Sequence, residues 1–228
     1  MNGTPVGLGK DPLQVFTVKI QNNIPVLCIS GQIYGGLTTK KEYGDYHLKM
    51  EFKWGEKKYE PRLNVKRDNG ILYHAYGNHG AFWNVWMNSQ EFQVQETDMG
   101  DYFALGPGSD IRAEYRTEDG ETAWIYDPSA PYEIFSGSYN RGRCRRAINN
   151  EKPHGEWNSL ELICLGGQSL HIVNGKVVME LNNSRVISTS GATTTLEKGR
   201  IQIQSEGAEA YYRNIFIRPI TEIPEQYQ

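Results

Sequence analysis

Hydrophobic and polar residues alternate along much of this chain. From Tyr46 to Trp54 every even-numbered residue is apolar and every odd-numbered residue is polar. Successive side chains of a β-strand point to opposite faces, so this pattern predicts a strand with one buried and one solvent-facing side. Helical periodicity is nearly absent. We therefore expect a protein built almost entirely of strands.

A turn signal in the second half predicts a β-hairpin. Asn174-Gly175 separates two apolar runs, residues 169–173 and 176–181, and such a pair is the strongest short-range hairpin signal. Residues 200–204 and 211–217 continue the alternation. Strands that follow one another without intervening helices favour two packed antiparallel sheets.

The remaining length suits one domain. The 228 residues are enough for one substantial sandwich, and we expect a single all-β jelly roll over residues 1–228 with few or no helices. Between about 106 and 153 the residues Gly, Pro, Ser, Asp and Arg dominate. This composition predicts long surface loops, a common place for binding elements.

Charge and cysteine content exclude several classes of protein. The net charge of -3 provides no basic field for a nucleic-acid partner, and we interpret the arginines of 141–146 as a solvated or locally paired loop. Three widely spaced cysteines support neither a disulfide framework nor a structural zinc. No segment is apolar for long enough to span a bilayer.

The start of the sequence bears on location. Residues 1–4 lack the charged and apolar regions of a signal peptide. We expect a periplasmic or extracellular protein if the sequence is a mature form, and a cytoplasmic one otherwise.

Residues 91–96 carry the most informative pattern. Phe92 and Val94 should pack between the sheets, which leaves Glu91, Gln93 and Gln95 on the opposite face. A bulge or the end of the strand could bring Glu96 beside them. The simplest interpretation is a strand whose outer face meets water. The composition nearby favours a sugar site instead, because rings, amides and carboxylates together bind sugars. These neighbours are Phe82, Trp83, Trp86, Tyr102 and the acidic segment 96–101.

The carboxylates allow two kinds of chemistry. Glu91 and Glu96 could be the nucleophile and acid of a retaining glycosidase, which needs a separation of about 5–5.5 Å. Their spacing resembles the Glu-x-Asp-x-x-Glu strand of laminarinase-type jelly-roll hydrolases, with Gln93 where that family has Asp. Alternatively, one carboxylate could act as a general base that removes a carbon-bound proton.

A wider set of motifs occurs in a familiar order. The segments are 68–74, 91–98 with 100–101, 155–158, 173–176, 199–207 and 213–217. Together they resemble the 3-keto-disaccharide hydrolase domain family, frequent in bacteria that degrade plant and host glycans, over about residues 31–220. The resemblance implies a concanavalin-like jelly roll that acts on glycosides oxidised at C3. Removal of the C2 hydrogen would then expel the aglycone from C1, and a divalent metal could stabilise the enolate.

The resemblance also suggests roles for individual side chains. Glu91 is the leading base, and Gln93 would hold a sugar hydroxyl. His74 could be an acid, a base or a metal ligand, and Glu96 and Asp98 could bind a metal or a sugar. The remaining substrate-binding candidates are Gln95, Trp83, Trp86, His79 and Glu206.

The alternative to an enzyme is a non-catalytic carbohydrate-binding module or lectin, because jelly rolls serve both purposes. A binding module needs rings and amides but has no use for carboxylates clustered beside a histidine. Glu91, Glu96, Asp98 and His74 therefore favour catalysis, although calcium-dependent lectins also use acidic clusters.

Overall fold

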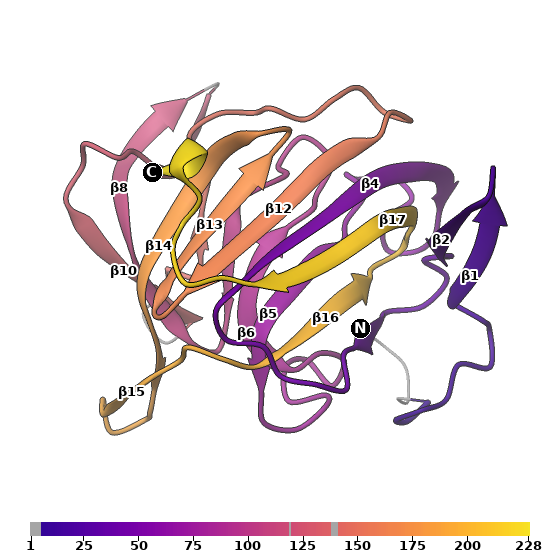
Figure 1. The fold of residues 1–228 in the computed structure, drawn as a ribbon, viewed down its shortest axis with the longest axis horizontal. Helices are drawn as coiled ribbons and strands as arrows, with labels where there is room; N and C mark the ends of the chain where they lie inside the picture. Colours follow the sequence, from indigo (N-terminus) through magenta and orange to yellow (C-terminus); the bar gives the residue numbers. More distant parts are fainter. Residues whose placement is uncertain (1–5, 119, 138–140) are drawn as a thin grey trace.

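Two antiparallel β-sheets make up most of the chain in the computed structural model, which describes residues 6–118, 120–137 and 141–228 (Figure 1). The larger sheet contains, in spatial order, β1 (Phe16–Gln21), β2 (Ile24–Ile29), β17 (Ala208–Pro219), β4 (Tyr46–Lys58), β12 (Asn158–Leu165), β13 (Gln168–Val173), β14 (Lys176–Ile187), β8 (Gly108–Glu118) and β10 (Tyr132–Ser136). Two further strands, β9 (Glu121–Tyr126) and β15 (Thr193–Thr195), pair with β8 and β14 respectively.

The smaller sheet lies behind the larger one in Figure 1. Its spatial order is β11 (Arg143–Cys144), β7 (Tyr102–Leu105), β6 (Asn88–Gln93), β5 (Gly70–Tyr76), β16 (Arg200–Ser205) and β3 (Gly35–Thr38). A 3-10 turn, η2 (Glu225–Tyr227), lies near the C-terminus, and the described residues contain no α-helix. Accordingly, no helix among them is long and apolar enough to cross a membrane. The prediction of an all-β jelly roll with two antiparallel sheets is confirmed.

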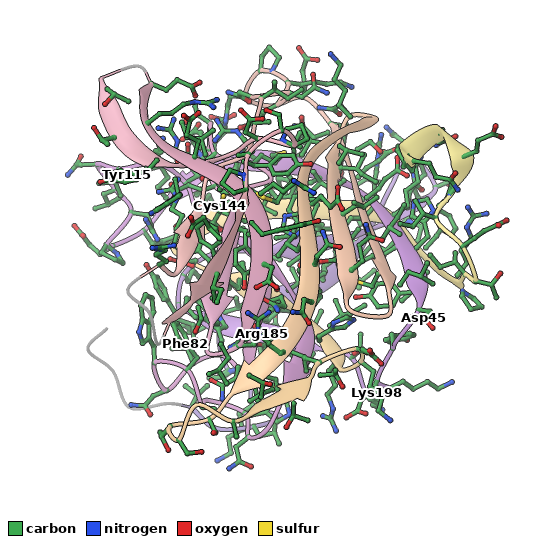
Figure 2. All side chains as sticks on the ribbon, turned by 90° about the vertical axis from the view of Figure 1, so that its left-hand side faces the viewer. Asp45, Phe82, Tyr115, Cys144, Arg185 and Lys198 are labelled. Atoms are coloured by element: carbon green, nitrogen blue, oxygen red, sulfur yellow. The ribbon has the colours of Figure 1, made fainter. Side chains whose placement is uncertain are left out.

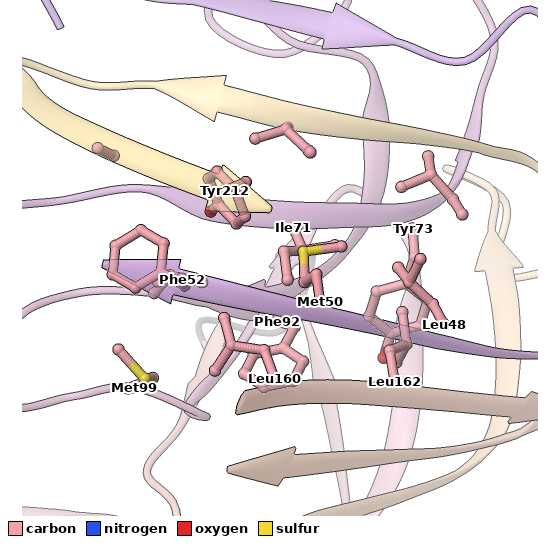
Figure 3. Packing of buried hydrophobic residues seen from close by; sticks show 14 of the residues in the cluster. Leu48, Met50, Phe52, Ile71, Tyr73, Phe92, Met99, Leu160, Leu162 and Tyr212 are labelled. Atoms are coloured by element: carbon pink, nitrogen blue, oxygen red, sulfur yellow. The ribbon is translucent and has the colours of Figure 1, made fainter. Parts of the chain in front are cut away.

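Strand β4 shows how the alternation produces the core. Its even-numbered residues from Tyr46 to Trp54 are all buried, as the pattern predicts. They face apolar residues of the smaller sheet, among them Ile71 of β5 and Phe92 of β6 (Figure 3). Burying these side chains is the main driving force that holds the two sheets together.

The predicted hairpin is formed by β13 and β14. Asn174 and Gly175 connect them with φ angles of 49° and 81°. A two-residue turn with positive φ at both positions has a twist that matches the flanking strands, and Asn and Gly tolerate that conformation best.

The prediction of long loops between 106 and 153 is wrong, because β8, β9, β10 and β11 lie there. The hairpin of β8 and β9 projects from one end of the sandwich, where Figure 2 labels Tyr115. Polar residues lie on both faces of this projecting part: Glu114, Arg116 and Glu118 on one side and Tyr115 and Thr117 on the other. Because neither face of this part is buried in the core, its residues do not alternate between apolar and polar, and the sequence pattern does not reveal the strand.

The burial of the core predicts that replacing phenylalanine by alanine has different effects on stability at two positions. Phe92→Ala removes a fully buried ring and should lower the free energy of unfolding by about 3–5 kcal/mol. Phe216→Ala removes a ring that is 66% exposed and should change it by no more than about 0.5 kcal/mol. Urea denaturation of both variants checks this; equal losses would contradict the assignment of Phe92 to the core.

Candidate functional site

The smaller sheet has one face in the core and one face turned outward. In β6 the side chain of Phe92 packs in the core, so its neighbours Glu91 and Gln93 belong to the opposite face. The strand register places Glu91 between Leu72 of β5 and Phe103 of β7. This outward face, centred on Glu91, is the candidate site.

Gly70 allows two polar side chains to meet at the centre of this face. A Cβ at residue 70 would overlap Oε1 of Glu91 and Oε1 of Gln204, a residue of β16. The two oxygens are therefore close neighbours above the glycine. Oε1 of Gln204 is buried and receives no hydrogen bond from the described residues.

Burial raises the pKa of Glu91 well above its ordinary value, and the negative charges of Glu206 and Asp68 raise it further. The positive charges of Arg62 and Arg143 oppose this effect without cancelling it. A protonated Glu91 would have Oε1 of Gln204 as a neighbouring acceptor. A hydrogen bond between them would satisfy a buried oxygen that otherwise lacks a partner among the described residues.

Two more carboxyl groups lie in the next row of the same face. Asp68 and Glu206 form a β-bridge, and the guanidinium of Arg62 pairs with both side chains. Burial raises the pKa of both carboxyls. The negative charge of Asp68 and the hydrogen bond between the two side chains raise the pKa of Glu206 further, whereas the same hydrogen bond lowers the pKa of Asp68. Nε2 of Gln95 donates a hydrogen bond of 2.7 Å to Asp68 and favours its ionised form. Glu206 is therefore the member of the pair that keeps a proton.

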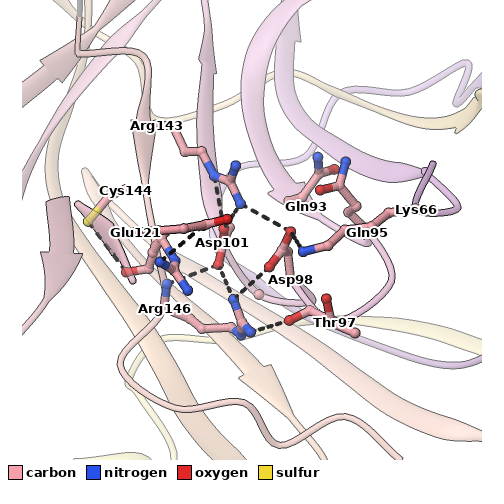
Figure 4. A network of polar contacts seen from close by, with 12 residues as sticks. Lys66, Gln93, Gln95, Thr97, Asp98, Asp101, Glu121, Arg143, Cys144 and Arg146 are labelled. Carbon is pink, nitrogen blue, oxygen red and sulfur yellow. Dashed lines mark hydrogen bonds and ion pairs between the residues drawn. The ribbon is translucent and has the colours of Figure 1, made fainter. Parts of the chain in front are cut away.

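Acidic and basic residues pair closely beside this group (Figure 4). Nη2 of Arg143 lies 2.6 Å from Asp101, and Nη1 of Arg146 lies 2.9 Å from the other oxygen of Asp101. Lys66 donates to Asp98 at 2.7 Å. Burial disfavours ionisation of Asp98, but the hydrogen bond from Lys66 and the nearby arginines lower its pKa overall. Arg143 and Arg146 of the basic segment are thus locally paired.

Aromatic side chains border Glu91 on the other side. Trp86 is buried, donates from Nε1 to the carbonyl of Gly35 at 2.9 Å and stacks on Tyr34 with centroids 5.8 Å apart. Trp83 is 62% exposed, and the centroid of its ring lies 6.0 Å from that of Trp86. Together with Phe103, these rings give the face an apolar border of the kind found in sugar sites.

The structure brings several of the predicted residues to this one face: Glu91, Gln93, Gln95, Glu206, Trp86 and, through Lys66 and Arg143, Asp98. Trp83 lies at its border. The three remaining predicted residues, His74, Glu96 and His79, lie elsewhere.

His74 lies within a bulge of β5 and has a φ angle of 49°, which turns its side chain out of the regular alternation. Its ring is fully buried and makes edge contacts with Tyr46 and Tyr73 at 6.2 and 5.5 Å. Burial lowers the pKa of His74 to about 4, so the ring is neutral near pH 7. The expectation that His74 works beside Glu91 is therefore corrected.

Glu96 and His79 also differ from expectation. Strand β6 ends at Gln93, and Glu96 lies beyond it, 2.9 Å from Arg67. Its carboxylate pairs instead with Arg67 and His154, so the structure does not show the expected pair with Glu91. His79 is exposed and lies 3.4 Å from Arg200.

The proposed metal ligands do not come together either. His74 is buried elsewhere, Glu96 pairs with Arg67, and Asp98 pairs with Lys66 and two arginines. In the part of the chain that the structure describes, no three His, Cys, Asp or Glu side chains form a group that could hold a metal ion. The donor set does not fit a divalent metal, and we derive no step through one.

Several residues of the site were not predicted, among them Arg62, Asp68, Gly70 and Gln204. The alternation in 200–204 contains the signal for Gln204, because Gln202 and Gln204 alternate with Ile201 and Ile203 and must share the outer face. Asp68 and Gly70 belong to the motif 68–74 at the start of β5, and the sequence marks this segment without assigning a role to either residue. Nothing in the loop sequence indicates that Arg62 folds back onto Asp68.

Comparisons with known proteins agree with this fold. Residues 10–218 match the sequence profile of a family described as the 3-keto-alpha-glucoside-1,2-lyase-like domain. No curated protein matches. A proposed glycosyl hydrolase from Parabacteroides distasonis shares the fold with a TM-score of 0.54 and 20% identity, covering 92% of this chain and 93% of that one. The carbohydrate-binding module CBM66 from Bacillus subtilis has a TM-score of 0.50 and 8% identity, covering 89% and 91%.

Adding one methyl group at residue 70 should disrupt the site. In Gly70→Ala the new Cβ would displace Glu91 and Gln204, which should cost about 1–3 kcal/mol of unfolding free energy. Gly167→Ala is the matched control, because its Cβ would make only ordinary contacts, and we expect a change within about 0.5 kcal/mol. Urea denaturation measures both, and an unchanged Gly70→Ala protein would contradict the close approach.

The raised pKa of Glu206 predicts how stability depends on pH. Its folded-state pKa lies above the unfolded value of 4.5, so its stabilising contribution is complete below that value and is lost as the pH rises through the folded pKa. Glu206→Gln removes this loss. Between pH 5 and 8 the variant should gain stability relative to the wild type by on the order of 1.4 kcal/mol per unit of raised pKa.

Denaturation at several pH values checks the sign of this effect. Glu197→Gln, at an exposed glutamate, is the control and should follow the wild-type curve. A Glu206→Gln protein that loses stability relative to the wild type as the pH rises would contradict the assignment.

Proposed function

Because this chain belongs to the family of 3-keto-alpha-glucoside-1,2-lyase-like domains, we propose that it cleaves glycosides whose sugar is oxidised at C3. The family supports a function related to sugars. The observation that carries the catalytic proposal is the group of three buried carboxyls with raised pKa values, Glu91, Asp68 and Glu206, on one sheet face. Groups with such shifts concentrate at catalytic sites.

The reaction begins with removal of a proton from carbon. The ketone at C3 acidifies the hydrogen on C2, and a base that takes this hydrogen leaves an enolate. The enolate re-forms the ketone by making a C1–C2 double bond and breaking the bond from C1 to the glycosidic oxygen. That oxygen takes up a proton and departs as an alcohol. Water that adds to the double bond then gives net hydrolysis.

Glu91 is the proposed base. Its raised pKa means that the carboxylate, once ionised, holds a proton more strongly than an ordinary glutamate, which suits a weakly acidic C–H bond. The amide of Gln204 would hold the carboxyl in place above Gly70. Arg62 and Arg143 supply the positive charge that would stabilise the enolate oxygen.

The pair of Asp68 and Glu206 is the proposed source of the proton for the departing oxygen. These carboxyls are joined by a shared hydrogen bond and are held by Arg62. Because Glu206 keeps its proton to a higher pH than an ordinary glutamate, it can act as an acid near neutral pH.

A sugar-binding module is the second candidate function. Glu91, Asp68 and Glu206 are each no more than 6% exposed, and two of them are already paired with Arg62. Carboxyls that are so buried and paired could have a purely structural role, which a binding module allows. Such a module would bind a sugar through Gln93, Trp86 and the neighbouring polar groups without converting it.

Turnover of a 3-keto-glucoside separates these functions. Glu91→Gln should lower kcat/KM by about 10²- to 10⁴-fold, because the amide cannot accept the proton. Glu96→Gln, the same substitution at a residue paired with Arg67 outside the site, should leave kcat/KM within a few-fold of the wild type. In the wild type, kcat/KM should rise with pH toward the raised pKa of Glu91.

Other outcomes of this assay would contradict the proposal. Wild-type activity in Glu91→Gln would exclude Glu91 as the base. Conversion of an ordinary glucoside would favour direct glycoside hydrolysis. Binding of both sugars without conversion of either would favour the module.

A further inference from the structure

A cavity lies on the same sheet face, on the far side of Phe103 from Glu91. Its volume is about 470 Å³, within the range of small-molecule sites. Phe103 pairs with Glu91 on one side and with Arg143 of β11 on the other. Phe103 and Arg143 both line the cavity, so it directly adjoins the site.

Strand β9 extends the cavity beyond the smaller sheet. Ile125 of β9 forms a parallel bridge with Arg145, which immediately follows β11. Trp124 of β9 and Tyr115, its partner on β8, line the far end. The floor of the cavity therefore runs from β7, through β11, to the hairpin of β8 and β9.

Rings and guanidinium groups dominate the lining. The guanidinium of Arg141 lies 4.5 Å from the ring of Trp124, and that of Arg143 lies 5.2 Å from the ring of Phe103. These arginines also have carboxylate partners outside the cavity, Glu133 for Arg141 and Asp101 for Arg143. These carboxylates fix the positions of the two arginine side chains. The planar guanidinium groups and the rings beside them can then stack on a ligand.

Arg145 is the cationic side chain of the cavity with the weakest partner. Its Nη1 is buried and has no hydrogen-bond acceptor among the described residues. The nearest carboxylate, Glu121, is 3.6 Å away and its side chain is 80% exposed. That distance is too long for a good hydrogen bond, and an exposed ion pair contributes little.

We propose that this cavity binds the leaving group of the substrate and prefers a ring that carries a carboxylate. The carboxylate would pair with Arg145 in place of Glu121, and the ring would stack against Trp124, Tyr115 or Phe103. The inference rests on the proposed function, because it takes Glu91 as the point of cleavage. A hexuronosyl group and a carboxyaryl group share this chemistry.

Binding measurements test the cavity without any turnover. Calorimetry would compare 4-carboxyphenyl α-glucoside with phenyl α-glucoside, neither of which is oxidised. The wild type should bind the acid at least tenfold more tightly, and Arg145→Gln should reduce this preference to less than twofold. Arg116→Gln is the matched control on the same hairpin, since Arg116 pairs with Glu114, Glu118 and Asp127 and does not line the cavity.

A second variant guards against misfolding of Arg145→Gln. Glu121→Gln changes an exposed side chain and removes the carboxylate that competes for Arg145, so it should bind the acid more tightly than the wild type. Equal binding of acid and neutral glucosides by the wild type would overturn the proposal, as would weaker binding of the acid by Glu121→Gln.

Turnover of the corresponding 3-keto compounds distinguishes this inference from the proposed function. A preference in binding without cleavage of either 3-keto compound would remove the proposed function and keep the cavity assignment as a binding site. Cleavage of both without any preference would overturn the cavity assignment alone. A glucosyl-glucuronic acid in place of the aryl glucoside shows whether the carboxylated ring is a sugar: tighter binding than the neutral disaccharide supports the proposal, and no difference restricts it to aryl acids.

Discussion

The missing side chain at residue 70 is the constraint on which the candidate site depends. Only a glycine there leaves room for the carboxyl of Glu91 and the amide of Gln204 to meet on the sheet surface. The strands on either side, β6 and β16, supply these two groups, while β5 contributes the gap between them. The backbone hydrogen bonds among these three strands hold Glu91 and Gln204 next to each other. The carboxyl of Glu91 is therefore more fixed in position than that of an exposed glutamate.

Burial then determines the chemistry of that acid. Leu72 and Phe103 flank Glu91 and remove it from water, so its neutral form is favoured. Arg62 and Arg143 limit this rise in the pKa of Glu91, and both also pair with neighbouring carboxylates. The face consequently combines acids that keep their protons with cations that are fixed in direction, an arrangement suited to moving a proton and stabilising negative charge.

The sequence predicted the parts of this arrangement that follow from period-two alternation. The buried side of β4, the hairpin at Asn174 and the outward direction of Glu91 and Gln93 all follow from that period. His74 has the right period for the outer face, but a bulge with positive φ reverses its direction, and no residue pattern marks that bulge. Side chains that reach the site from loops, such as Arg62, depend on a tertiary fold that local pattern does not encode.

Strand β9 connects the two sheets to each other. It pairs with β8 of the larger sheet and, through Ile125 and Arg145, also meets the smaller sheet. The two sheets are thereby joined by backbone hydrogen bonds as well as by the apolar core. A rotation of one sheet against the other must strain these backbone hydrogen bonds, so the width of the cavity beside β9 is tied to the angle between the sheets.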